Sequence, residues 1–332
     1  MRKMNVVLSL LLVAALGCQR EGKIAVQDAT RQDAQLLPAD VNTIMYCNVR
    51  NVVQSPLAQE VLQQIENRMR EEMSHDRYEE FKSATGFDPK RDLHSVLAGA
   101  RQMHGHDEDL YAIVHGQFDE QKIVAFIKQE MDSARHEIHW QEETIGGHRV
   151  YFNSRKEQRG LCFVNNTTIY AGSREWLTQA LAGKKSGEVP KVFAALENKI
   201  RFGDQLWMAV SVDTALHAEP AFARKLRENF PKLETVEDLV FSAHVTDGVR
   251  FEGQLQCQNA EDSKLMVDLM RGALAAAKLQ VSKDRAAVDA LNSIKVDQKG
   301  EQALLHGELT PKFFDTLRAQ KMFIWGDRHH VI

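Results

Sequence analysis

The sequence predicts an α+β fold built as two similar halves, each an antiparallel sheet with helices packed on one face. Short runs of β-forming residues alternate with segments in which apolar residues recur every three or four positions. The turn dipeptides Gly146-Gly147 and Asp247-Gly248 join neighbouring strand-like runs and predict antiparallel hairpins. An apolar strand, a short loop and a helix opening with proline occur over residues 43–62 and again over residues 206–226, which predicts an internal repeat.

The first 17 residues form a different kind of sequence, typical of a signal peptide. Arg2 and Lys3 precede an apolar stretch, residues 4–17, that only two polar residues interrupt. This stretch is too short to span a bilayer as a helix, which needs about 20 apolar residues, but it has the length of the apolar region of a secretory signal. We therefore expect residues 1–17 to direct export.

Small residues come directly before the first cysteine, in Ala15-Leu16-Gly17-Cys18. This segment resembles the lipobox of bacterial lipoproteins, although Ala15 stands where that motif prefers leucine. The resemblance implies cleavage after Gly17, lipidation of Cys18 and attachment to a bacterial membrane, facing the periplasm. By the same resemblance Gln19, in place of an inner-membrane retention aspartate, favours the outer membrane. The alternative is an ordinary secretory signal or a short anchor with an incidental cysteine.

The rest of the chain divides by composition and pattern. Residues 18–35 are polar with little periodicity and predict a tether after the lipidated cysteine. Residues 36–183 form the first expected α+β repeat, residues 184–190 a Gly/Ser/Pro-containing linker, and residues 191–332 the second repeat.

The elements of the first repeat follow from periodicity, caps and turns. Ser55-Pro56 predicts a helix start, Gly86 and Pro89 a helix stop, and Asp119 another helix start. The expected strands cover residues 43–53, 93–103, 110–118, 137–143, 148–153, 161–165 and 168–172, with a helix over about 174–181.

The second repeat is expected to begin with the strand at residue 206 and a helix after Pro220. A hairpin over residues 239–257, a long helix capped by Asn259, a hairpin over residues 294–309 and a final helix from Thr310 follow. Three similar tetrapeptides, "HGQF", "EGQL" and "HGEL", contain Gly116, Gly253 and Gly307, and each is expected to end a strand just before a helix.

Composition excludes several classes of function. The net charge is −4 and basic residues are scattered among acidic ones, so nothing supports nucleic-acid binding. The motifs GxSxG, HExxH and GxGxxG do not occur. We therefore expect a protein that is not an enzyme and needs no cofactor.

The segment richest in metal-ligating side chains is the expected loop at residues 104–109. His104, His106, Asp107 and Asp109 could hold a divalent cation. Nothing elsewhere has a fixed spacing that would complete a coordination shell, so an exposed polar turn is the favoured interpretation and these four residues stay weak metal candidates.

Cys47, Cys162 and Cys257 remain after Cys18, each in an apolar strand-like run. An odd number cannot pair completely within one chain, and buried free thiols are the favoured interpretation. One disulfide between two of them stays open, because an exported protein can form it.

Residues 36 to about 183 resemble a group of uncharacterised bacterial lipoproteins and exported proteins. The shared features are a Leu-Pro-Ala-Asp opening, a strand, a Ser-Pro-capped helix and a Thr-Gly-x-Asp-Pro-x-x-Asp segment. Here they occupy Leu37 to Asp40, Ser55-Pro56, and Thr85, Gly86, Asp88, Pro89 and Asp92. The resemblance implies architecture and location, and no activity or catalytic residue.

The sequence thus favours a lipid-anchored, periplasm-facing envelope lipoprotein of unknown activity, a non-enzymatic protein-binding or structural module. The alternative is a carrier that holds a lipid or another hydrophobic ligand between sheet and helices. The expected partners are the membrane, through the lipid anchor, and either an envelope protein or such a ligand.

Overall fold

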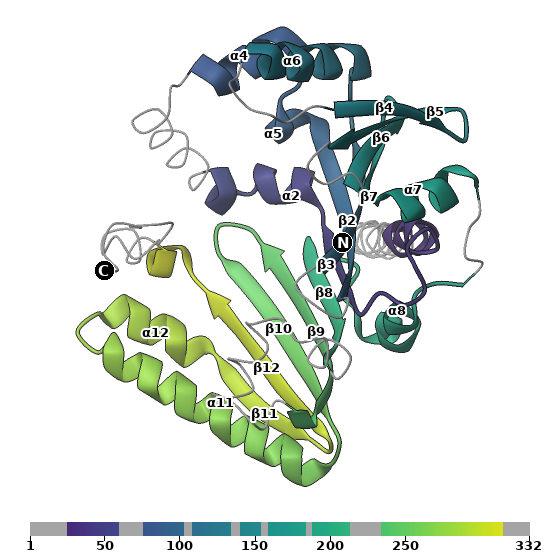
Figure 1. Ribbon diagram of the computed structural model, residues 1–332. Coiled ribbons are helices and arrows are strands. Elements are labelled where there is room, and N and C mark those ends of the chain that lie inside the picture. The colour runs from purple at the N-terminus through teal and green to yellow at the C-terminus, as the bar shows by residue number, and fades with distance from the viewer. Residues whose placement is uncertain are drawn as a thin grey trace, which may run out of the picture.

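A single antiparallel sheet organises the protein in the computed structural model, which describes residues 25–59, 76–102, 108–133, 140–153, 159–183, 188–212 and 234–314 (Figure 1). Its strands are β1 (Thr43–Cys47), β2 (Leu93–Gln102), β3 (Glu108–Gly116), β4 (Trp140–Ile145), β5 (His148–Asn153), β6 (Arg159–Asn165), β7 (Thr168–Ser173), β8 (Leu206–Ser211), β9 (Val236–Val245), β10 (Val249–Cys257), β11 (Lys295–Lys299) and β12 (Gln302–Leu309). Their order across the sheet is β11-β12-β10-β9-β8-β1-β2-β3-β7-β6-β5-β4.

Helices cover both faces of this sheet. They are α2 (Val49–Gln54), α4 (Asp76–Thr85), α5 (Pro89–Asp92), α6 (Glu120–Ser133), α7 (Arg174–Leu181), α8 (Lys191–Leu196), the 3₁₀ helix η2 (Glu197–Lys199), α11 (Ala260–Gln280) and α12 (Arg285–Ser293). Residues 25–34 are also helical. This N-terminal helix, α7 and α8 lie on one face, while α4 and α6 at one end and α11 and α12 at the other end lie on the opposite face (Figure 1).

The predicted α+β class is confirmed, but the two predicted sheets are one sheet. Strands β1 and β8, the first strands of the two expected repeats, pair antiparallel with Met45 opposite Met208. Outward from this pair the strand order is β1-β2-β3-β7 on one side and β8-β9-β10-β12 on the other. Internal duplication itself stays a prediction.

The structure differs from the expected tether over residues 25–34, which form a helix that packs against the sheet. Ala34 and Thr30 are buried, and Val26 contacts the main core. Arg31 forms an ion pair with Glu197 of η2. The composition of this segment indicated a tether because it is largely polar, and of its few apolar residues only Val26 and Ala34 meet the sheet, while Ala25 and Ala29 are exposed.

The expected boundary at residues 184–190 does not separate two cores. Val192, Phe193 and Leu196 of α8 are buried in the same hydrophobic cluster as Trp176 and Ile44 of the first expected repeat. The rings of Phe193 and Phe202 also pack on Trp207 of β8, so the segment after the linker completes the first core.

Most of the remaining helices and strands lie where the turn and cap residues in the sequence predicted them. Gly146 and Gly147 have φ values of +59° and +83° and turn β4 into β5, as predicted. The strand predicted over residues 43–53 was too long, because Asn48 caps α2 by accepting a hydrogen bond from Asn51 N at 3.1 Å. Ser55 begins the following helix at residues 56–59; the rest of that predicted helix, and the one after Pro220, lie outside the described residues.

The glycines of the three similar tetrapeptides occupy different positions in their strands. Gly116 ends β3, as expected, whereas Gly253 lies inside β10, paired with Phe241 and Leu305, and the strand continues to Cys257. Gly307 likewise lies inside β12. The tetrapeptide "HGEL" nevertheless ends β12 at Leu309, just before the helix at residues 311–314, as predicted. For "EGQL" the prediction was wrong, because the ladder with both neighbouring strands keeps β10 extended to Cys257.

Candidate functional site

The middle of the sheet carries an apolar surface between its two helix-covered ends. Residues directly opposite one another on neighbouring strands point to the same face. Met45 of β1 lies opposite Ala98 of β2 and Met208 of β8, and Met208 lies opposite Phe241 of β9. Extending this register gives a surface that we call the central trough: Thr43, Met45, Val96, Ala98, Ala100, Leu110, Ala112, Met208, Val210, Leu239, Phe241 and Phe251.

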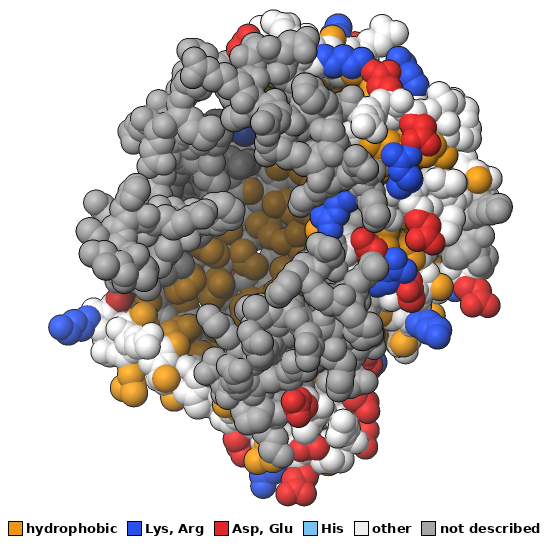
Figure 2. Space-filling model, viewed as in Figure 1, with side chains coloured by type: hydrophobic (Ala, Val, Ile, Leu, Met, Phe, Trp, Pro, Cys, Tyr) orange, Lys and Arg blue, Asp and Glu red, His pale blue; other side chains and the backbone are white. Residues whose placement is uncertain are grey.

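The side chains of the central trough are accessible, although they are apolar. Met45 is 41% exposed and Leu110 is 47% exposed, and the others are half-buried. On the same strands the alternate residues, among them Ile44 and Leu97, are buried in the main core on the opposite face. Figure 2 shows a hollow in the middle of the view whose visible floor consists of hydrophobic side chains.

The two ends of this face are closed by packed helices. Phe163 of β6 and Ile123 of α6 belong to one buried cluster, which Phe81 of α4 joins. At the other end Met266 of α11 packs against Cys257 and Ala303. The central trough therefore lies between two helix-covered regions of one continuous sheet.

Chemically the central trough suits an apolar ligand rather than a reaction. Thr43 is its one polar member, and the rest offer only aliphatic, thioether or aromatic surface. Two thioethers, Met45 and Met208, lie side by side in it, and methionine adapts to irregular apolar shapes. The rings of Phe241 and Phe251 stack with their centroids 6.2 Å apart and extend the same surface. An acyl chain matches this lining.

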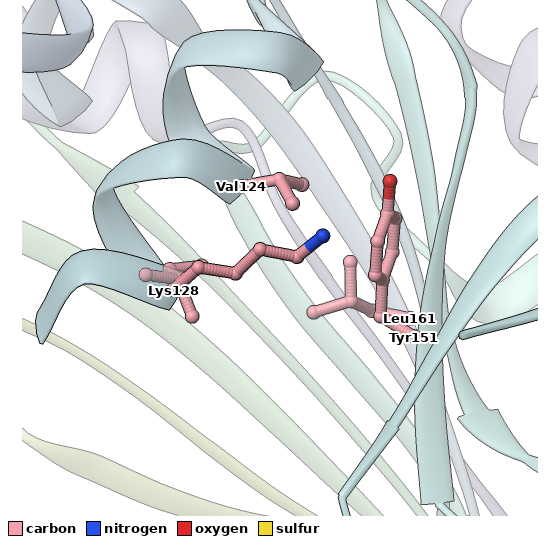
Figure 3. A pocket seen from close by; sticks show the side chains of 5 residues that line it. Val124, Lys128, Tyr151 and Leu161 are labelled. Atoms are coloured by element: carbon pink, nitrogen blue, oxygen red, sulfur yellow. The ribbon is translucent and has the colours of Figure 1, made fainter. Parts of the chain in front are cut away.

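A cavity of about 20 Å³ beneath α6 is too small for such a ligand. Figure 3 shows Val124 and Lys128 projecting from α6 towards Tyr151 and Leu161, which line it together with Ile127. This volume holds about one water molecule.

The polar groups beside this cavity are paired. The hydroxyl of Tyr151 donates to Glu120 Oε1 at 2.8 Å, and Lys128 forms an ion pair with Glu142. Burial, followed by the Glu120 hydrogen bond, raises the pKa of Tyr151 to about 12. The polar residues around this cavity therefore serve to pack α6 against the sheet.

Of the four weak metal candidates, Asp109 is the one that the structure describes. Asp109 lies with Oδ2 2.9 Å from Arg101 Nη2 and accepts a hydrogen bond from the Tyr111 hydroxyl at 3.2 Å, so a cation from the same chain neutralises its carboxylate. His104, His106 and Asp107 lie outside the described residues, as do Gly17 and Cys18. Within the described ranges, no group of three or more metal-ligating side chains is found.

Cys47, Cys162 and Cys257 are free thiols. They lie on β1, β6 and β10, separated by at least two intervening strands, and strands spaced about 4.8 Å apart put them beyond the reach of a disulfide. Burial raises the pKa of all three thiols, that of Cys162 to about 11, so none is an activated nucleophile.

Sequence reasoning missed the central trough, although a signal for it exists. In "TIMYC" and "LWMAV" the residues of both alternating positions are apolar except for Thr43, and such strands are apolar on both faces of a sheet. One face is the main core; the other is the central trough. What the strands cannot reveal is that α4 and α6 cover one end of the second face, α11 and α12 cover the other, and Met45 and Leu110 between them stay exposed.

No protein-family model matches this chain, and no curated protein matches it. Among solved structures, that of TP0453 in its crystal form I covers 86% of this chain and 96% of its own, with 10% identity and a TM-score of 0.44. This likeness is too distant to carry an argument. None of the described helices is long and apolar enough to cross a membrane.

Proposed function

We propose that this protein is an exported, lipid-anchored protein of a bacterial envelope that binds the acyl chains of a lipid, without catalysis, in the central trough. The observation that carries the proposal is the accessible apolar face of the central strands, centred on Met45 and Met208. Of the two functions that the sequence leaves open, this surface favours the hydrophobic-ligand carrier.

Energetics support an acyl chain as the ligand. Each methylene removed from water contributes about 0.8 kcal/mol, so a chain that buries roughly ten methylenes gains about 8 kcal/mol before the costs of ordering it. The strands that form the central trough are buried on their other face, which makes the surface rigid and preorganised for binding.

The proposed anchor keeps the central trough close to a source of lipid. Lipidation of Cys18 with two or more chains would hold the protein stably at the membrane surface. Because residues 25–34 form a helix packed on the sheet, only residues 19–24 separate Cys18 from the folded body. Six residues span at most about 20 Å. We propose the outer membrane as the site of attachment.

Native mass spectrometry of the chain from Gln19 onward, purified from bacteria, tests the carrier function directly. We expect adducts with the masses of lipids, removable by organic extraction. We also expect the extracted protein to bind a fluorescent fatty acid, cis-parinaric acid, with saturation at one or a few molecules per chain. A bare mass together with no probe binding would overturn the proposal.

Two variants locate the bound chain. Met45→Glu and Leu110→Glu place a carboxylate on the central trough at positions exposed enough to keep it hydrated, so the fold should survive. Both should weaken probe binding by more than about tenfold. Leu279→Glu on α11 is the matched control, with a side chain 76% exposed, and should bind as the unchanged chain does. Equal binding by all three variants would contradict the central trough as the site.

A further inference from the structure

The outward side of α11 carries an apolar stripe with no contact in the described protein that explains it. Met266, Val267 and Ser263 are buried against the sheet. Roughly opposite them on the helix, residues spaced four, three, four and three positions apart form what we call the α11 stripe: Leu265, Leu269, Gly272, Ala276 and Leu279. All five are exposed, the three leucines by 41%, 37% and 76%.

We propose that this stripe is the contact between two copies of the protein, packed antiparallel around a two-fold axis at Gly272. Apolar spacing of four and three is the pattern with which two helices pack along their length. This proposal is independent of ligand binding, because the α11 stripe and the central trough are different surfaces.

Gly272 supports close approach of a second helix. Glycine is a poor helix former, and Gly272 lies in the interior of a 21-residue helix. A Cβ atom built there would meet nothing within 4 Å, so packing within the described chain does not require a glycine. A residue without a side chain at the crossing point lets two helix axes come closer together.

The charges along α11 select the antiparallel arrangement of two copies. In the N-terminal half Glu261, Asp262 and Asp268 lie close to the stripe and outnumber the one cation, Lys264. In the C-terminal half Arg271 and Lys278 are cationic, and Lys283 follows just beyond the helix end. A parallel pair would bring the acidic halves together. An antiparallel pair places each acidic half beside the basic end of the other copy. It also aligns the two helix dipoles antiparallel, which is the favourable orientation.

The same charges argue against a membrane surface as the occupant. Helices that lie on anionic membranes place Lys and Arg beside their apolar stripe. Here the residues nearest to the leucines in the N-terminal half are Asp262 and Asp268, whose carboxylates anionic lipid would repel. A second copy accounts for both features, because its own stripe covers the leucines and its basic helix end lies beside the acidic residues.

Disulfide trapping tests both the contact and its direction. With a two-fold axis at Gly272, residue 265 of one copy faces residue 279 of the other. In a Cys47→Ser background, the double variant L265C/L279C should form a covalent dimer on mild oxidation, while L265C alone and L279C alone should not. In a parallel pair L265C alone and L279C alone would each crosslink to themselves, and that result would overturn the proposed arrangement.

Sedimentation velocity of the chain from Gln19 gives the second measurement. We expect a concentration-dependent dimer that Leu279→Glu weakens by more than about tenfold. Gly272→Leu should raise the thermal unfolding midpoint, because leucine is the better helix former, and still abolish the dimer. Met45→Glu is the control and should dimerise normally. A chain that stays monomeric at all concentrations, or one whose Leu279→Glu variant loses binding to phosphatidylglycerol vesicles instead, would overturn the proposal.

Discussion

His115 of β3 lies with its Nε2 atom 2.8 Å from Oδ2 of Asp33 in the N-terminal helix. On the other side of the imidazole ring, Nδ1 is 3.4 Å from the hydroxyl of Thr168 on β7. The ion pair joins residues 82 positions apart and fixes the helix on the sheet. The segment that composition assigns to a tether is therefore held by a specific polar contact as well as by buried side chains.

This contact makes stability depend on pH in a defined direction. The hydrogen bond to Asp33 raises the pKa of His115 above its ordinary value of about 6.5, with burial opposing it. A raised folded-state pKa contributes stability that is fully present below the unfolded-state pKa and is lost as pH rises through the folded-state pKa. We expect His115→Gln to cost about 1 kcal/mol in the free energy of unfolding at pH 6 and less at pH 9.

Urea denaturation of the wild-type protein and of His115→Gln at several pH values measures this difference in the free energy of unfolding. Thr168→Val is the control, since it removes the weaker contact and leaves the ion pair in place. A gap between wild type and His115→Gln that widened from pH 6 to pH 9 would contradict the assignment of the ion pair.

Two glycines from similar tetrapeptides should respond in opposite ways to alanine. A Cβ atom on Gly116 would lie 2.5 Å from the backbone oxygen of Asp92 and 2.6 Å from the ring of Phe118, whereas on Gly253 its nearest neighbour would be 3.7 Å away. We expect Gly116→Ala to destabilise the protein by about 2 kcal/mol and Gly253→Ala to stay within about 0.5 kcal/mol of the wild type. Thermal unfolding followed by circular dichroism compares them, and equal losses would refute the packing argument.

The three free thiols should react in a fixed order. Cys47 is partly exposed and shares a face of the sheet with Met45, whereas Cys162 and Cys257 are fully buried. We expect N-ethylmaleimide to modify Cys47 first and the other two only on unfolding. Mass spectrometry of tryptic peptides gives the order. If the proposed ligand occupies the central trough, cis-parinaric acid should slow the modification of Cys47; modification of Cys162 before Cys47 would contradict the burial pattern.

Replacement of the expected lipidated residue tests location. We expect Cys18→Ser to remove incorporation of labelled palmitate. We also expect less of the full-length protein in the membrane fraction, with the rest found in the soluble fraction or as the uncleaved precursor. Cys47→Ser, with its acylation and fractionation unchanged, is the control. A Cys18→Ser protein that still carries lipid and sediments with membranes would refute lipid anchoring at this residue.

Local chemistry accounts for the elements that the sequence predicted well. The helix expected over residues 174–181 is α7, Ser173 caps it, and Asn259 caps α11 as predicted. Hairpin turns at Gly146-Gly147 and Asp247-Gly248 join the expected strands. Caps and turns are interactions within a few residues, so the sequence itself contains both partners of each contact.

The sequence by itself therefore determined the α+β class, most of the strands and several helix starts, because each depends on neighbours in the chain. Only the tertiary structure decided that β1 pairs with β8, that residues 25–34 pack on the sheet, and that the face carrying Met45 and Met208 stays accessible. Those outcomes depend on contacts between residues far apart in sequence. An apolar strand shows that a face avoids water, but not which partner covers it.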